Sequence, residues 1–155
     1  MENFKSFITE VGQFSYPFEK TGYVGSGENK THVYHFTDEK DNPTKVEITH
    51  YKNKKTGKTN AEVSFLDPSE RPGRRVDASG KKGYGSVKTF STVNNILKTH
   101  QKENPHIENY TFTSAAHEKS RVSLYKKFAS KMGGSSKTTS DGLDVIHAIP
   151  SKSFS

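Results

Sequence analysis

The chain contains no cysteine and few aliphatic side chains. Without cysteine it can form neither a disulfide framework nor a cysteine-ligated metal site. No apolar run approaches the length of a membrane span. The first residues also lack the basic segment and continuous apolar stretch that mark a secretory signal. We therefore expect a soluble protein that acts in a cytoplasm-like compartment and has no membrane partner.

Leu, Ile, Val and Phe make up only 30 of the 155 residues, a share at the edge of the range of disordered chains. Aromatic residues, at 11%, and valines that alternate with polar residues indicate a folded chain instead. The net charge of +7 is modest for this length, while an isoelectric point near 9.5 favours a polyanionic partner such as nucleic acid or a phosphorylated cofactor. The composition indicates one small domain with generous polar loops.

Alternating apolar and polar residues predict strands over residues 31–37, 44–51, 61–66, 110–113 and 143–149. Apolar stripes at helical spacing predict helices over residues 86–100 and 114–132. The second helix ends at Gly133, because glycine tolerates the left-handed conformation beyond a helix end. An antiparallel meander followed by a β-α-β-α-β half gives an α/β (α+β) fold.

A glycine-rich turn stands before the first of these helices, with the sequence Lys81-Lys82-Gly83-Tyr84-Gly85-Ser86. Its two glycines let the backbone approach a ligand closely, and the free N–H groups of the first helical turn then point at that ligand. A phosphate or pyrophosphate fits such a place, and the two lysines add positive charge. The alternative is a turn with no ligand.

The order of this turn, a short strand and a helix that carries Leu124-Tyr125 resembles the GNAT-type N-acetyltransferase fold over roughly residues 46–149. The resemblance implies a GNAT-like mixed sheet and acetyl-CoA as cofactor, with its pyrophosphate held at the glycine-rich turn. It also implies that Tyr125 is the general acid that protonates the departing thiolate. A phenol with a pKa of about 10 can donate that proton.

Two positions depart from the family pattern, and they lower the expected activity. Gly80 stands where the family usually has Gln or Arg, and Glu118 stands where it commonly has Asn before the Leu-Tyr pair. Glu47 and Glu62 are candidates for a general base, or are simply outward-facing strand residues. We expect a GNAT-like protein that is weakly catalytic or non-catalytic, with an active acetyl-CoA-dependent N-acetyltransferase as the alternative.

Basic residues gather in the connector between two predicted strands and in the long loop that follows. Lys54 and Lys55 lie in the connector, and Arg71, Arg74 and Arg75 lie in the loop. Flexible cationic segments suit contact with a phosphate backbone without sequence readout. A non-specific nucleic-acid-binding module is therefore a further alternative function, and an ordinary solvated surface is the alternative reading of these residues.

The seven histidines lead us to expect no metal site. His32 and His35 are an odd number of residues apart on a predicted strand, so they face opposite sides and cannot chelate one ion. The other five are scattered along the sequence.

The opening segment, MENFKSFITEVG, places its apolar residues on one helix face: Phe4, Phe7, Ile8 and Val11. It resembles the capsid-targeting peptides of tailed bacteriophages, which end in Ile or Leu, any residue, then Glu, after which the prohead protease cuts. The resemblance implies a targeting helix over residues 1–10, cleavage between Glu10 and Val11, and a single GNAT-like domain over residues 11–155. A helix that packs permanently on the sheet is the alternative.

These features together predict a phage head-associated or internal virion protein. Its expected partners are the capsid or scaffold, through the N-terminal helix, and packaged DNA, beside which a positive charge is favourable. Its expected location is the virion interior or the host cytoplasm.

Overall fold

The computed structural model describes residues 15–25, 30–37, 43–65 and 84–155, with the backbone alone at residues 84–87. The strands are β1 (Phe18–Val24), β2 (Thr31–Thr37), β3 (Pro43–Lys52), β4 (Thr59–Phe65), β5 (Ile107–Ala115), β6 (Ser135–Thr138) and β7 (Asp144–Pro150). The helices are α2 (Tyr84–Glu103), α3 (Lys119–Lys131) and the short 3-10 helix η3 (Ser151–Phe154). Neither α2 nor α3 has the length and apolar character that a membrane crossing requires.

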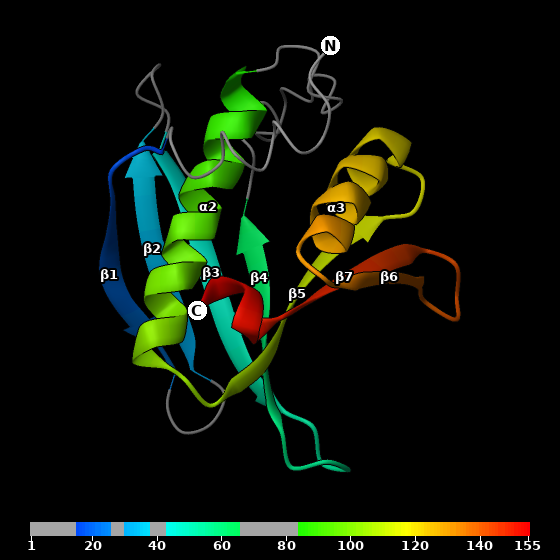
Figure 1. Cartoon of the computed structure of the whole chain (residues 1–155), viewed down its shortest axis with the longest axis horizontal. Helices are drawn as coiled ribbons and strands as arrows, with labels where there is room; N and C mark the ends of the chain where they lie inside the picture. Colours follow the sequence, from blue (N-terminus) through cyan, green and yellow to red (C-terminus); the bar gives the residue numbers. More distant parts are fainter. Residues whose placement is uncertain (1–14, 26–29, 38–42, 66–83) are drawn as a thin grey trace.

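The strands of the described chain form one mixed sheet in the order β1-β2-β3-β4-β5-β7-β6 (Figure 1). Strands β1 to β4 are an antiparallel meander, and β5, β7 and β6 are antiparallel to their neighbours. The pair β4–β5 is parallel. Helix α2 lies between these two strands in the chain, because a parallel pair needs a long crossover connection. The predicted α/β (α+β) class is confirmed at this level.

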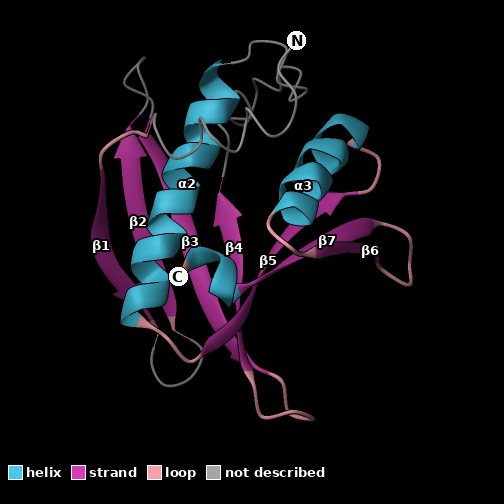
Figure 2. Cartoon of the chain, viewed as in Figure 1, coloured by secondary structure: helices cyan, strands magenta, loops and turns pink. Residues whose placement is uncertain are grey.

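Both long helices cover the same face of the sheet, α2 over the meander and α3 over β5 to β7 (Figure 2). Aromatic side chains join the two helices to the sheet. The ring of Phe90 on α2 lies 5.3 Å from Phe128 on α3 and 5.8 Å from Phe65 on β4. Phe154 of η3 is fully buried, with its ring 5.2 Å from Tyr110 on β5. One aromatic-rich core therefore holds the helices, the sheet and the C-terminal residues together.

The alternation seen in the sequence produces this core. Val46 and Ile48 on β3 are fully buried, whereas Glu47 between them is partly exposed on the other face. Tyr34 and Phe36 on β2 are buried in the same way. The predicted stripe of α2 is also buried at the described positions: Phe90, Val93, Ile96 and Leu97. The predicted faces of these elements are therefore confirmed.

The sheet has two edge strands that the pattern did not predict. β1 exposes most of its residues and contains a bulge next to Gly22, whose φ of 130° suits glycine. β6 has only the polar residues Ser-Ser-Lys-Thr. Edge strands bury little of their surface, so neither strand has a hydrophobic alternation to recognise.

Two predicted helix starts are displaced in the structure. Helix α3 begins at Lys119 rather than near Ser114, because β5 continues its pairing with β7 as far as Ala115. Helix α2 begins at Tyr84, two residues before the predicted start at Ser86. Tertiary strand pairing thus overrides the helical pattern at the start of α3.

Candidate functional site

The centre of the sheet opens where its parallel strands separate. The β4–β5 ladder runs from Thr59 opposite Ile107 to Glu62 opposite Thr111, and it ends there. Beyond this point β4 stays paired with β3 as far as Phe65, while β5 stays paired with β7. The two strands therefore follow different neighbours, and Figure 1 shows them moving apart.

A cleft of about 100 Å³ lies at this separation. Its lining combines apolar and polar side chains from both strands and from α3: Glu62, Val63, Ser64, Phe65, Phe112, Thr113, Arg121 and Tyr125. Five of its eight lining residues have polar side chains, so the cleft offers charged and hydrogen-bonding groups to a small ligand. This cleft is the first candidate site.

Tyr125 forms part of the cleft wall and also belongs to the core. Its side chain is 8% exposed. Its ring lies 5.4 Å from Phe90 and 5.6 Å from His147, both at steep angles. The structure therefore places the predicted acid at the cleft, with its ring held by aromatic neighbours. Most of the phenol is withdrawn from solvent.

An ion pair fixes the first turn of α3 beside the cleft. The Arg121 guanidinium contacts the Glu118 carboxylate at 2.9 Å, three residues apart on the helix. Arg121 and Glu62 together give the cleft one cationic and one anionic side chain. Glu62 is exposed on β4, as the outward-facing interpretation expected, yet it lines the cleft.

The other predicted cofactor residues are only partly described. Lys81, Lys82 and Gly83 lie outside the described residues. The backbone of Tyr84, Gly85 and Ser86 forms the first turn of α2, where free N–H groups are expected. A helix therefore begins at the predicted glycine-rich turn, whereas the predicted role of Lys81 and Lys82 stays untested.

Of the predicted nucleic-acid-binding and cleavage residues, the structure likewise describes only some. Lys54 and Lys55 are exposed in the β3–β4 turn, where no acidic side chain of the described chain pairs with them. Three residues of the basic loop lie outside the described residues: Arg71, Arg74 and Arg75. Glu10 and Val11 also lie outside them, as does the whole segment of residues 1–10.

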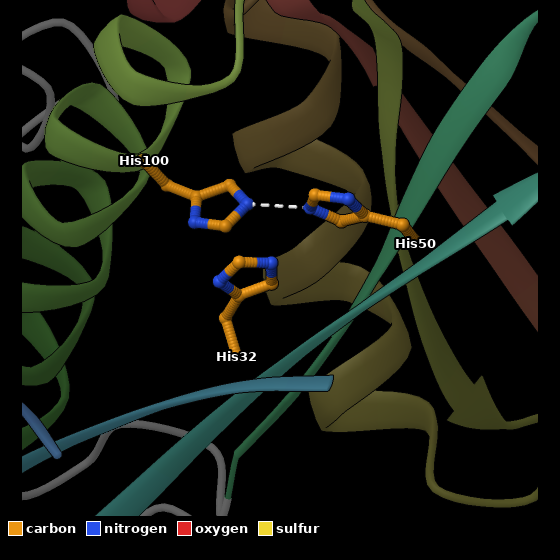
Figure 3. A group of neighbouring side chains, drawn as sticks. All are labelled: His32, His50 and His100. Carbon is orange, nitrogen blue, oxygen red and sulfur yellow. Dashed lines mark hydrogen bonds between the residues drawn. The ribbon is translucent and has the colours of Figure 1, made fainter. Parts of the chain in front are cut away.

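A second candidate site consists of three buried histidines. His32 on β2, His50 on β3 and His100 on α2 are 8%, 6% and 0% exposed. One ring nitrogen from each lies within 4.8 Å of the other two. Figure 3 shows the three rings pointing toward one another from the two strands and the helix. The fold therefore gathers residues that are far apart in the sequence.

Hydrogen bonds position two of these three rings. Nε2 of His50 lies 2.8 Å from Nε2 of His100, so one nitrogen donates and the other accepts. Nδ1 of His100 lies 2.9 Å from the Tyr34 hydroxyl. Nδ1 of His32 is buried and has no hydrogen-bond partner. One polar atom of the cluster therefore lacks the partner that burial normally demands.

Burial keeps these imidazoles neutral at ordinary pH. Desolvation lowers the pKa of His100 to about 3 and that of His50 to about 4. The pKa of His32 is lowered first by burial and then by the charges of Lys20 and Lys30. A neutral imidazole is the form that binds a metal ion.

His147 shows how a buried histidine of this fold is satisfied without a ligand. Its Nε2 lies 2.9 Å from the Ser114 hydroxyl, and its Nδ1 lies 2.7 Å from the Ser136 hydroxyl. Burial lowers the pKa of His147 to about 4. Both ring nitrogens have partners, so His147 is a structural residue that joins β5, β7 and β6.

Sequence reasoning missed the histidine cluster, although the signal was available. His32 shares a strand face with Tyr34, His50 shares one with Ile48, and His100 follows Ile96 by one helical turn. Each histidine therefore falls on a predicted core face. The expectation of no metal stays untested, but its basis does not hold for these three residues, which the fold brings together.

Comparison with known proteins gave no match to this chain: no protein-family model matches it, and neither does a curated protein or a solved structure.

Proposed function

We propose that this chain is a GNAT-like protein of a tailed-bacteriophage head, whose cleft between β4 and β5 receives the thioester end of acetyl-CoA. The observation that carries the proposal is the position of Tyr125. The phenol that the family resemblance assigns as the acid lines a cleft between the separated strands. Its ring could equally have packed elsewhere in the core.

The order of the elements supports the same proposal. An antiparallel meander leads through α2 into a strand, a helix and two further strands. The sheet changes from antiparallel to parallel pairing at β4–β5. This arrangement agrees with the mixed sheet that the resemblance implies, in which the helix after the meander begins at the glycine-rich turn.

The chemistry of the cleft suits an acylated pantetheine arm. The ends of β4 and β5 no longer pair with each other beyond Glu62 and Thr111, so their facing edges can accept an extended chain that carries amide groups. A cleft of about 100 Å³ has room for roughly three water molecules of about 30 Å³ each. It therefore fits the thioester tip, and the rest of the cofactor would lie toward the first turn of α2.

The proposed reaction transfers the acetyl group to an amine. The amine nitrogen attacks the thioester carbonyl carbon, and the tetrahedral intermediate then expels the thiolate. Tyr125 donates its phenolic proton to the sulfur as the C–S bond breaks. We assign Glu62, which lines the cleft, as the acceptor of the proton that the amine loses. Because Tyr125 is 8% exposed, we expect slow turnover.

The binding test compares the melting temperature with and without acetyl-CoA. At a cofactor concentration 100 times Kd, binding stabilises the folded state by about 2.7 kcal/mol. For a chain of this length the melting temperature then rises by roughly 5–10 °C. Thr113→Trp fills the cleft and should abolish the rise. Glu108→Trp, an equally exposed position of β5 outside the cleft, is the matched control. No rise with the unmodified chain contradicts the proposal.

A separate test addresses the chemistry. Tyr125→Phe keeps the ring among its aromatic neighbours but removes the proton donor. We expect thiol release from acetyl-CoA to fall while cofactor binding persists. Unchanged thiol release would remove Tyr125 from the mechanism and leave the cleft as a binding site alone.

Head association is tested on virus particles. The opening segment supports this part of the proposal, since it resembles a prohead targeting peptide. Intact-mass analysis of purified virions should find the chain beginning at Val11. A chain in virions that still starts at Met1 contradicts cleavage after Glu10, and its absence from virions contradicts head association.

A further inference from the structure

We propose that His32, His50 and His100 form a Zn²⁺ site that joins β2, β3 and α2. The three side chains are almost fully buried, and one nitrogen from each lies within 4.8 Å of the others (Figure 3). This site is distinct from the cleft, since none of the three histidines is among the residues that line it.

The spacing of the nitrogens is close to what a tetrahedral zinc ion requires. With Zn–N bonds of about 2.0–2.1 Å, ligand nitrogens stand about 3.3 Å apart. Nε2 of His50 and Nε2 of His100 are 2.8 Å apart, and all three ligand atoms fall within 4.8 Å. To hold an ion between the rings, the Nε2 atoms of His50 and His100 must move slightly apart and the His32 ring must move inward. Side-chain rotation is sufficient for both movements.

The unpartnered nitrogen is the second, independent observation. Nδ1 of His32 is buried without a hydrogen bond, whereas both nitrogens of His147, which is also buried, have hydroxyl partners. A buried polar atom without a partner costs about 1–3 kcal/mol. Coordination to a metal ion by the His32 ring removes that cost, either directly at Nδ1 or through the ring rotation that accompanies binding.

Tyr34 supplies the outer contact that zinc-bound histidines usually have. Its hydroxyl is 2.9 Å from Nδ1 of His100, which leaves Nε2 directed at the cluster. A ligand histidine that donates its other N–H to an oxygen atom is fixed in tautomer and orientation. Tyr34 is therefore a positioning residue for the site.

The chemistry of the ligands favours a transition-metal ion such as Zn²⁺. Three neutral imidazoles without a carboxylate favour zinc over magnesium or calcium, which prefer oxygen ligands. His106 lies near the cluster, with its ring 5.7 Å from that of His50. The fourth ligand is therefore either His106 or a water molecule. Lys20 and Lys30 oppose a cation near His32, while Glu103 favours one. The Lys20–Glu103 ion pair at 3.3 Å reduces the effect of Lys20.

The test titrates the full chain, first treated with a chelator, with Zn²⁺ in a calorimeter and with Co²⁺ in a spectrometer. We expect one ion per chain and the intense visible bands of tetrahedral Co²⁺. His50→Gln and His32→Gln should abolish both signals. His35→Gln, which removes a histidine from the opposite face of β2, should change neither. Circular dichroism establishes whether each variant folds.

Tyr34→Phe keeps the proposal testable if the ligand variants do not fold. It retains the ring and should weaken Zn²⁺ binding by 10–100-fold through loss of the outer contact. The proposal is overturned if the unmodified chain binds no stoichiometric Zn²⁺ or lacks the tetrahedral Co²⁺ bands. It is also overturned if folded His50→Gln or Tyr34→Phe binds zinc as tightly as the unmodified chain.

Discussion

Gly134 is a position where the addition of a single methyl group should cause a severe steric conflict. It follows α3 and donates its backbone N–H to the Ala129 carbonyl at 2.7 Å. A Cβ atom at this position would stand 1.9 Å from the backbone oxygen of Ala148, while real Cβ atoms essentially never approach within 3.0 Å. Ala148 cannot retreat easily, since it lies in β7 between Thr111 of β5 and Ser135 of β6.

We expect Gly134→Ala to destabilise the protein by about 3 kcal/mol. Overpacking against a fixed backbone costs about 1–3 kcal/mol, and loss of the Gly134–Ala129 hydrogen bond adds about 1 kcal/mol. For a chain of this length, 3 kcal/mol corresponds to a fall in melting temperature of roughly 6–12 °C. Urea unfolding followed by circular dichroism measures the change directly.

Gly133→Ala is the matched control for this prediction. A Cβ at Gly133 meets nothing within 4 Å, although the residue has a φ of 79°. The left-handed conformation costs a non-glycine residue about 1–2 kcal/mol, so Gly133→Ala should be the milder change. If Gly134→Ala is no more destabilising than Gly133→Ala, then β7 does not approach the end of α3 as closely as the structure shows.

Three further predictions concern other parts of the chain. Burial lowers the pKa of His147 from 6.5 to about 4, so its stabilising contribution is present above pH 6.5 and is lost as the pH falls toward 4. The free energy of unfolding falls by up to about 3 kcal/mol over this range. His147→Gln should therefore reduce the pH dependence of urea unfolding. Phe154→Ala removes a fully buried ring and should cost about 3–5 kcal/mol in the same assay. If the chain binds DNA, Lys54→Glu with Lys55→Glu should reduce the slope of log affinity against log salt concentration by about one per lysine.

Each of these predictions has an outcome that contradicts it. Equal pH dependence with and without His147 would show that its folded-state pKa is not lowered. A loss below about 1 kcal/mol for Phe154→Ala would show that η3 does not complete the core. Lys126→Glu with Lys127→Glu makes the same change in net charge at exposed positions of α3, away from the hairpin. If the α3 pair shifts the salt dependence as much as the Lys54 and Lys55 pair does, the hairpin makes no specific phosphate contact.

The sequence was sufficient to predict the elements that bury one face. Val46 and Ile48 alternate with charged neighbours, and the apolar stripe of α2 runs from Phe90 to Leu97 among the residues whose side chains are described; the burial of these residues confirms both patterns. The edge strands β1 and β6 could not be predicted from the sequence pattern, because backbone pairing and not side-chain burial holds them in the sheet. Such pairing leaves no period in the sequence.

The candidate sites depended on contacts between distant parts of the chain. Tyr125 was placed by its position in an ordered set of motifs, so its location at a cleft could be anticipated. His32, His50 and His100 carry no spacing motif, since a ligand set drawn from two strands and a helix has no fixed separation in sequence. Each residue's burial could be read from the sequence, but the register between β2 and β3 was needed to bring the rings together.

The short parallel ladder at the centre of the sheet has a consequence for local unfolding. Four residue pairs join β4 to β5, whereas seven join β3 to β4 and seven join β5 to β7. The meander and the C-terminal strands are therefore two units joined by few backbone pairs and by the aromatic core, and amide hydrogen exchange at the β4–β5 ladder should be faster than in the longer ladders. A molecule held between β4 and β5 would contact both units at once. Its binding would slow exchange throughout both halves of the sheet, far from the atoms that it touches.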